Sequence, residues 1–187
     1  DMAKFKRDSC KNEISRQALN AGHNCLSSFY KVAHEKMLTY VSGLWNSESF
    51  SDENNILVAL LSLQSIIKKD PFYDKLYNFL VDDIKEIVMK LIFSDNIYIS
   101  VSSLILIYKS ISEFNCFINS PEEIDSLVTD LLSCSEKNSY RIKYCCDIIY
   151  VMCRNAKKRV TDGYETMDTS LVSKSCDQIA NALNYYI

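Results

Sequence analysis

The chain has 187 residues, of which 48% are hydrophobic and 24% charged, enough to bury a substantial core as a single domain over residues 1–187. Its net charge of −3 argues against a general nucleic-acid or anionic-membrane binder, and no apolar run reaches the roughly 20 residues of a membrane span. Only three Gly and two Pro occur, which favours long helices joined by short loops over sheets. The predicted fold is therefore all-α, with about eight helices.

The N-terminal half is predicted to contain four helices. The first covers about residues 4–20, and Gly22 separates it from a second helix that Asn24 caps. The third opens at Asp52. The fourth opens at Asp70, an N-cap that precedes a proline at the first helical position, and its inward face is expected to hold Leu76, Phe79 or Leu80, Ile84, Ile87 or Val88, and Leu91.

The C-terminal half is predicted to contain four more helices. The fifth begins near Asp95, and the sixth begins at the capping box of residues 120–123. The seventh, over residues 138–155, is expected to be the central helix, and a linker over residues 155–167 separates it from the last helix, over residues 169–186. The stripe of the central helix consists of Ile142, Cys146, Ile149 and Cys153, widened by Cys145, Ile148 and Met152. The four antiparallel hairpins should cover about residues 4–46, 51–93, 95–134 and 138–186.

A weak internal sequence repeat supports stacked helical hairpins. Similar apolar triplets begin at positions 60, 104 and 146, which are 44 and then 42 residues apart. A period of about 40 to 45 residues with helix pairs is typical of armadillo and HEAT repeats, so residues 52–186 resemble that class. This resemblance implies an intracellular scaffold that binds a partner peptide or helix in a groove.

The sequence contains no recognisable motif for catalysis, for a cofactor or for a metal. His23 and His34 are 11 residues apart, whereas a metal site on a helix would need a second ligand one turn away. There is no Cys-x-x-Cys pair and no glycine-rich phosphate loop. A Cys/His nucleophile pair stays open, because such partners meet only in the fold. We therefore expect a protein that is not an enzyme and has no cofactor or metal.

Eight cysteines make the sequence rich in this residue. Cys10 and Cys25 flank the first connection, Cys116 follows the fifth helix and Cys134 ends the sixth, and such placements suit disulfides better than core thiols. The chain starts at Asp1 rather than at Met, as a processed product or an excised fragment would, and removal of a signal peptide would produce such a start. These features favour a secreted, disulfide-stabilised protein, with a reduced, cytoplasmic protein as the alternative.

The placement of the cysteines also limits their pairing. Cys145, Cys146 and Cys153 share one helix, where adjacent residues point about 100° apart and two turns span on the order of 10 Å, so they cannot bond one another. If all eight are oxidised, three of the remaining five must bond this helix. Cys134 is the first expected partner because its turn to the helix is short, Cys176 the second and Cys116 the third. Cys10 and Cys25 would form the fourth bond.

A spacing of cysteines and tyrosine points to a known family. Cys146, Tyr150 and Cys153 lie along one helix. Cys25 and Tyr30 partly repeat this motif, with Ala33 at the position where the second cysteine would fall. Paired elements of this kind in a small helical protein rich in Asn, Lys, Tyr and Ile resemble the bicycle family of aphid salivary effectors. The resemblance implies a secreted protein that is delivered into plants and acts through contacts with a host protein.

Overall fold

The fold is all-α, as predicted. The computed structural model describes residues 13–46, 48–67, 73–117, 121–135 and 139–161, and within these ranges every regular element is helical. The chain divides into two compact units, residues 1–68 and 69–187. Each unit is described by itself, and the single-domain organisation stays a prediction.

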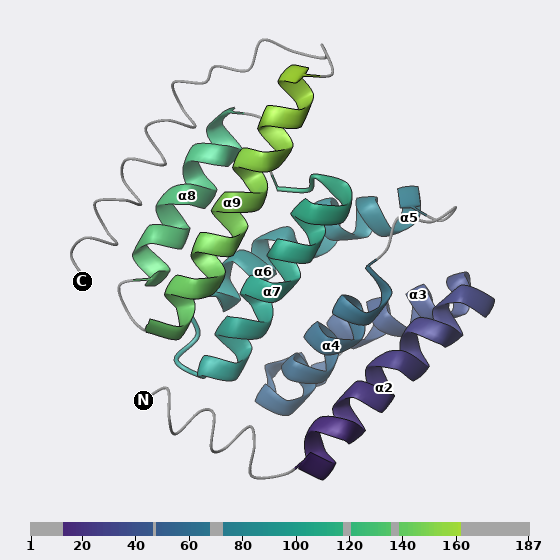
Figure 1. Ribbon diagram of the computed structural model, residues 1–187. Helices are drawn as coiled ribbons and strands as arrows, with labels where there is room; N and C mark the ends of the chain where they lie inside the picture. The colour runs from purple at the N-terminus through teal and green to yellow at the C-terminus, as the bar shows by residue number, and fades with distance from the viewer. Residues whose placement is uncertain (1–12, 47, 68–72, 118–120, 136–138, 162–187) are drawn as a thin grey trace. The chain divides into compact units, whose positions relative to one another are not determined.

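The first unit is a cluster of three helices that pack on one another (Figure 1). They are α2 (Glu13–Val32), α3 (His34–Trp45) and α4 (Glu53–Ile66), with a short 3₁₀ turn, η1 (Glu48–Ser51), between the last two. Asp52 caps α4 as predicted, because its carboxylate accepts hydrogen bonds from the backbone N–H groups of Asn54 (2.9 Å) and Asn55 (3.2 Å). The core of this unit contains Tyr30, Met37, Val41, Trp45, Ala59, Leu60, Leu63, Ile66 and Ile67.

The predicted boundary between the first two helices is wrong. The helix α2 runs through Gly22 and Asn24 without interruption, and the break comes at Ala33, whose φ of −139° and ψ of 53° are not helical. Gly22 is exposed, and a Cβ there would meet nothing within 4 Å. A single exposed glycine costs a helix only about 1 kcal/mol, so the contacts of the helix on both sides override it. The predicted residues 4–12 lie outside the described part of the chain.

The second unit is built around α9 (Ser139–Thr161), which packs against both α7 (Ile97–Phe114) and α8 (Pro121–Ser135). Figure 1 shows α8 and α9 side by side with α7 next to them. A further helical segment packs on α7 and consists of α5 (Tyr73–Asn78), the π-helix η2 (Phe79–Ile84) and α6 (Lys85–Leu91). The prediction of a central helix near residues 138–155 is therefore confirmed for this unit. Its core includes Leu76, Leu80, Ile84, Val88, Leu104, Ile107, Ile111, Leu131 and Ile148.

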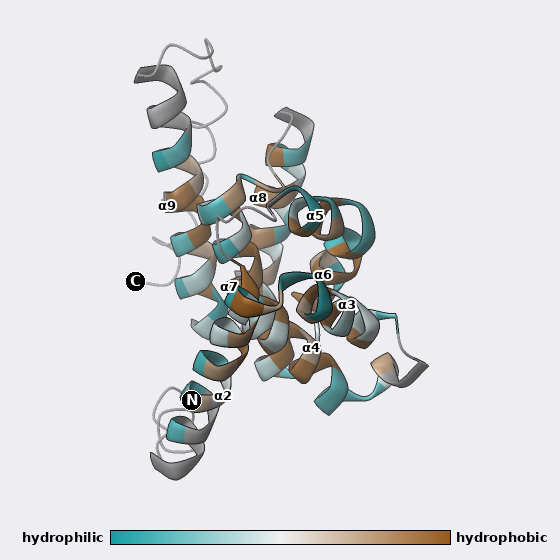
Figure 2. Ribbon diagram, turned by 90° about the vertical axis from the view of Figure 1, so that its right-hand side faces the viewer, coloured by the Kyte–Doolittle hydropathy of each residue, from teal (hydrophilic) through white to brown (hydrophobic). Residues whose placement is uncertain are grey.

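The helix α9 differs from its prediction in two respects. It continues to Thr161, so the described part of the predicted linker, residues 155–161, is helical. Of the predicted face, Cys145, Ile148, Ile149 and Met152 are buried as expected, whereas Ile142, Cys146 and Cys153 are only half-buried. The buried face also includes Arg141 and Val151, because α9 lies against both α7 and α8. Figure 2 shows the resulting alternation of polar and apolar residues along α9. The predicted last helix lies outside the described residues.

The π-helix η2 explains how one row of residues stays buried along the whole segment from α5 to α6. Every fourth residue from Leu76 to Ile92 is almost fully buried: Leu76, Leu80, Ile84, Val88 and Ile92. In an α-helix of 3.6 residues per turn, a four-residue step overshoots a full turn by about 40°, so this row would drift by about 160°. The wider π turn has more residues per turn and rotates the row back toward the core. The predicted inward residue Leu91 is half-buried, and Ile92 takes its place.

The helix α7 carries the most apolar sequence of the described elements. Among the described residues it is the one helix whose length and composition would allow it to cross a membrane, a test that a buried core helix also passes. Ten of its 18 residues are buried inside the protein. Its hydrophobicity, which Figure 2 shows in brown, is thus accounted for by packing against α6 and α9.

Candidate binding groove and cysteine cluster

A groove of about 540 Å³ lies between α6 and α8 in the second unit. Its apolar surface comes from Met89, Phe93, Phe117 and Leu127, of which Phe117 and Leu127 are buried and the other two half-buried. This volume is within the range of sites that hold a small molecule or a few side chains of a partner. The remaining lining residues are mostly charged: Lys85, Glu86, Lys90, Glu123, Ser126 and Asp130.

The charges of the groove are divided between its two walls. Lys85, Glu86 and Lys90 lie on α6, and Glu123 and Asp130 lie on α8, so the α6 wall is mostly basic and the α8 wall is acidic. Lys85 and Glu123 form an ion pair across the groove. The side chains of Lys90 and Asp130 have no ion-pair partner among the described residues, and burial raises the pKa of the Asp130 carboxyl. Besides the Lys85–Glu123 pair, the groove therefore offers Lys90 and Glu86 on the α6 wall and Asp130 on the α8 wall to a ligand that covers its apolar surface.

Two unusual backbone segments border this groove. The π-helix η2 ends immediately before Lys85, and single π turns inside helices are frequent at functional sites. Phe117, in the lining, has a φ of 70°, a left-handed conformation that is costly for a bulky residue. Strained residues cluster where function requires a particular surface. Both features mark the groove as the candidate functional site.

The structure brings together two of the predicted cysteines, Cys134 at the end of α8 and Cys145 on α9. Both are buried, with 0% and 3% of their surface exposed, and they lie close enough for each to shift the pKa of the other. The Cys134 thiol donates to the carbonyl oxygen of Ile92 at 3.2 Å. Cys134 was the first expected partner of the central helix, and the structure places it beside that helix. All six described cysteines are free thiols in the structure, so disulfide stabilisation is not shown.

The other described cysteines lie in different environments. Cys25 is exposed on α2, and Cys146 and Cys153 are half-buried on α9. Cys116 is buried in the turn after α7, where burial raises the pKa of its thiol to about 12. The predicted bonds of Cys10 and Cys176 lie outside the described residues.

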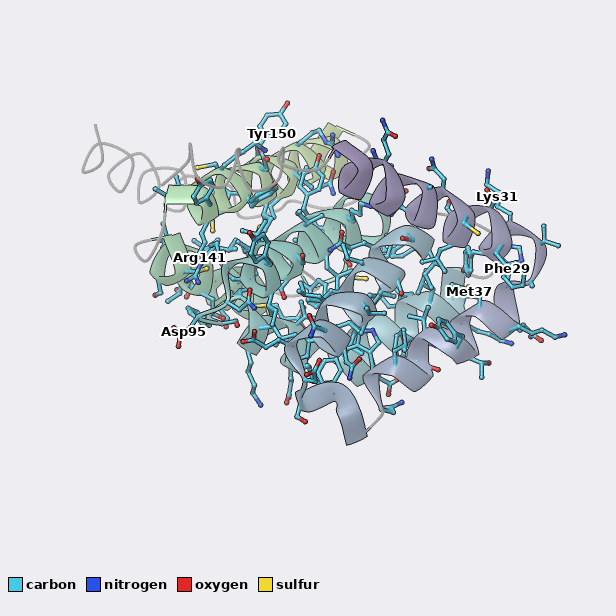
Figure 3. All side chains as sticks on the ribbon, turned by 90° about the horizontal axis from the view of Figure 1, so that it is seen from below. Phe29, Lys31, Met37, Asp95, Arg141 and Tyr150 are labelled. Carbon is cyan, nitrogen blue, oxygen red and sulfur yellow. The ribbon has the colours of Figure 1, made fainter. Side chains whose placement is uncertain are left out.

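The two Cys–Tyr elements differ in exposure. The side chain of Tyr150 is 68% exposed and projects away from α9 (Figure 3), whereas Tyr30 is 1% exposed and packs edge-on against the ring of His34 at 4.7 Å. Tyr30 thus serves the core of the first unit, and Tyr150 is available on the surface of the second. The spacing of the motif does not give its two tyrosines the same environment.

The two histidines have packing roles. His23 shares a hydrogen bond of 2.7 Å with the hydroxyl of Ser65, which joins α2 to α4. His34 packs against Tyr30. Within the described ranges, no group of three histidine, cysteine or acidic side chains has the geometry of a metal site.

Comparison with known proteins finds no matching family model, no matching curated protein and no matching solved structure. The fold and the groove therefore carry the functional argument.

The sequence reasoning missed the groove because its residues come from three separate segments. Residues 85–93, Phe117 and residues 123–130 meet only after α6 and α8 have packed. The sequence carried no clear signal of the π turn either, because Phe79, Ile87 and Leu91 give this segment an ordinary helical pattern, and only the structure shows that every fourth residue from Leu76 to Ile92 is buried.

Proposed function

We propose that the protein is a non-enzymatic binding protein that holds an amphipathic helix of a partner protein in the groove between α6 and α8. The observation that carries the proposal is the groove itself, with an apolar surface between a wall that offers Lys90, together with Glu86, and a wall that offers Asp130. Helix-in-groove recognition uses an apolar stripe for affinity and flanking polar groups for orientation. The partner helix should therefore carry an acidic residue on one flank of its stripe and a basic residue on the other.

We further propose that this binding takes place in a secreted, host-directed setting. The number and spread of the cysteines and the resemblance to the bicycle family support this setting. The armadillo/HEAT resemblance supports the same mode of binding inside a cell. Counting free thiols on denatured, unreduced protein from its natural source separates the two settings, because eight reactive thiols would contradict secretion.

Binding can be tested without knowing the partner by selecting amphipathic helical peptides from a displayed library. We expect the wild-type protein to select peptides with one acidic and one basic flank. Lys90→Glu should weaken these peptides about tenfold and favour peptides with two basic flanks, and Asp130→Lys should favour two acidic flanks. These preferences do not depend on the direction in which the peptide lies.

Asp125→Lys is the matched control, because Asp125 is exposed on α8 but does not line the groove. It should leave peptide selection unchanged. The proposal fails if the selected peptides bind Lys90→Glu and Asp130→Lys as tightly as wild type. If no peptide depends on the groove and a small zwitterionic amphiphile binds there instead, the occupant is a small molecule.

A further inference from the structure

The turn after α7 places a phenylalanine in the groove in a conformation that is costly for it. Phe117 has a φ of 70°, in a region that glycine and asparagine adopt readily and bulky residues rarely do. Its ring is nevertheless 1% exposed, which makes it the most buried of the residues that line the groove between α6 and α8. A strained residue persists only where its surroundings hold it in place, so other contacts must fix this turn.

One side chain from α9 holds the start of the turn. Asn115, two residues before Phe117, ends α7 with a φ of 61° and donates its backbone N–H to the carbonyl oxygen of Ile111 at 3.1 Å. The side-chain Nδ2 of Asn155 donates to the same carbonyl oxygen at 3.1 Å and to the side-chain oxygen of Asn115 at 2.9 Å. A single amide group of α9 therefore ties down both the last turn of α7 and the left-handed residue that follows it.

We propose that Phe117 sets the depth of the groove and that Asn155 is the positioning residue that holds Phe117 in place. If the turn were free, the φ of Phe117 would relax to an ordinary value of about −60°, and its ring would leave its present position. Asn155 does not line the groove, so it acts on the site through the turn and not through a ligand. The inference rests on the proposed function of the groove, but the position of Phe117 can be measured without any ligand.

The position of Phe117 is measured by fluorine NMR on the full-length protein, with 4-fluorophenylalanine at residue 117 alone. Asn155→Leu keeps a side chain of similar size but removes both hydrogen bonds, and it should shift or broaden the fluorine resonance. Ile149→Val is the matched control, since it disturbs the buried face of the same helix without touching the turn and should leave the resonance in place. An unchanged resonance in Asn155→Leu overturns the proposal.

The depth of the groove is measured by repeating the peptide selection with variants. Phe117→Ala removes the ring, so it should select peptides in which one residue of the apolar stripe is larger, such as Trp in place of Leu. Asn155→Leu should shift the selection in the same direction and bind these peptides about tenfold more tightly than wild type does. The double variant should select the same peptides as Phe117→Ala alone, because Asn155 acts through Phe117.

Two outcomes of the selection contradict this role of Asn155. One is a uniform loss of affinity in Asn155→Leu with no change in the preferred residues, which is the result of general destabilisation. The other is an additional shift in the double variant beyond that of Phe117→Ala. If wild type selects no peptide that depends on the groove, the proposed function fails, and the fluorine resonance by itself supports or overturns the positioning role of Asn155.

Discussion

Arg141 shows how one side chain can link the stability of the protein to pH. Its guanidinium is buried, makes one hydrogen bond to the Ser94 carbonyl and leaves two nitrogens unpartnered among the described residues. A buried cation of this kind is costly when its surroundings are neutral and favourable when a negative charge forms beside it. The ionisation of Cys134 therefore decides the contribution of Arg141 to folding.

We predict that the stability difference between wild type and Arg141→Met grows with pH under reducing conditions. The folded pKa of Cys134, about 7, lies below its ordinary value of 9.0, so its contribution to stability is complete above pH 9 and is lost as pH falls through 7. Between pH 6 and 8.5, wild type should gain on the order of 1 kcal/mol in unfolding free energy relative to Arg141→Met. The raised pKa of Cys145 acts in the opposite direction above pH 9, outside this window.

Urea unfolding at several pH values measures this difference. Arg154→Met, on the exposed side of α9, is the control and should show no pH-dependent difference from wild type. A constant difference between wild type and Arg141→Met across the window would show that Arg141 does not lower the pKa of Cys134.

At the scale of an element, the segment from α5 to α6 shows how one irregular turn controls both the packing of the core and the position of the groove. Its buried row repeats every four residues, and the π turn of η2 keeps that row directed into the core. The same turn sets the rotation of α6 and thereby aims Lys85, Met89 and Lys90 into the groove. The packing of the core and the position of the candidate site thus depend on one irregular turn.

Deleting Asp82 should convert η2 into a regular α-helix. The protein should keep its far-UV circular dichroism but lose at least about 2 kcal/mol in unfolding free energy, because part of the row from Leu76 to Ile92 would turn away from the core. Peptide binding in the groove should be lost as well, since α6 would rotate by about 100°.

The substitution Asp82→Ala separates the geometry from the side chain. Asp82 is exposed, so its replacement should change stability by no more than about 0.5 kcal/mol. A deletion variant as stable as Asp82→Ala would show that the π turn is not needed for packing.

At the scale of the whole molecule, the chain has two compact units with separate apolar cores. Trp45, the sole tryptophan, is buried in the first unit near the ring of Phe50 at 5.1 Å, so its fluorescence reports on that unit. Ile107 is fully buried in the second. Trp45 fluorescence therefore follows the first unit alone, and a substitution at Ile107 perturbs the second.

We predict that Ile107→Ala lowers the stability of the second unit by about 2 to 5 kcal/mol and leaves the Trp45 fluorescence transition in place. Circular dichroism follows both units and should show an earlier first transition in this variant. Val41→Ala, in the core of the first unit, is the reciprocal variant and should shift the fluorescence transition. If Ile107→Ala shifts the Trp45 fluorescence transition together with the circular dichroism transition, the chain unfolds as the single domain that its length suggests.

The sequence by itself determined the helical class, the start of α4 at Asp52, the start of α9 near residue 139 and the central place of α9 in its unit. These features follow from caps and from periodicity, which act between residues a few positions apart. Only the tertiary structure decided the break at Ala33, the π turn, the groove and the meeting of Cys134, Cys145 and Arg141. Each of these depends on helix packing between segments that are distant in the sequence. Burial in that packing overrides the local preference of a residue for helix or turn, and it brings charged side chains and thiols from different helices next to one another.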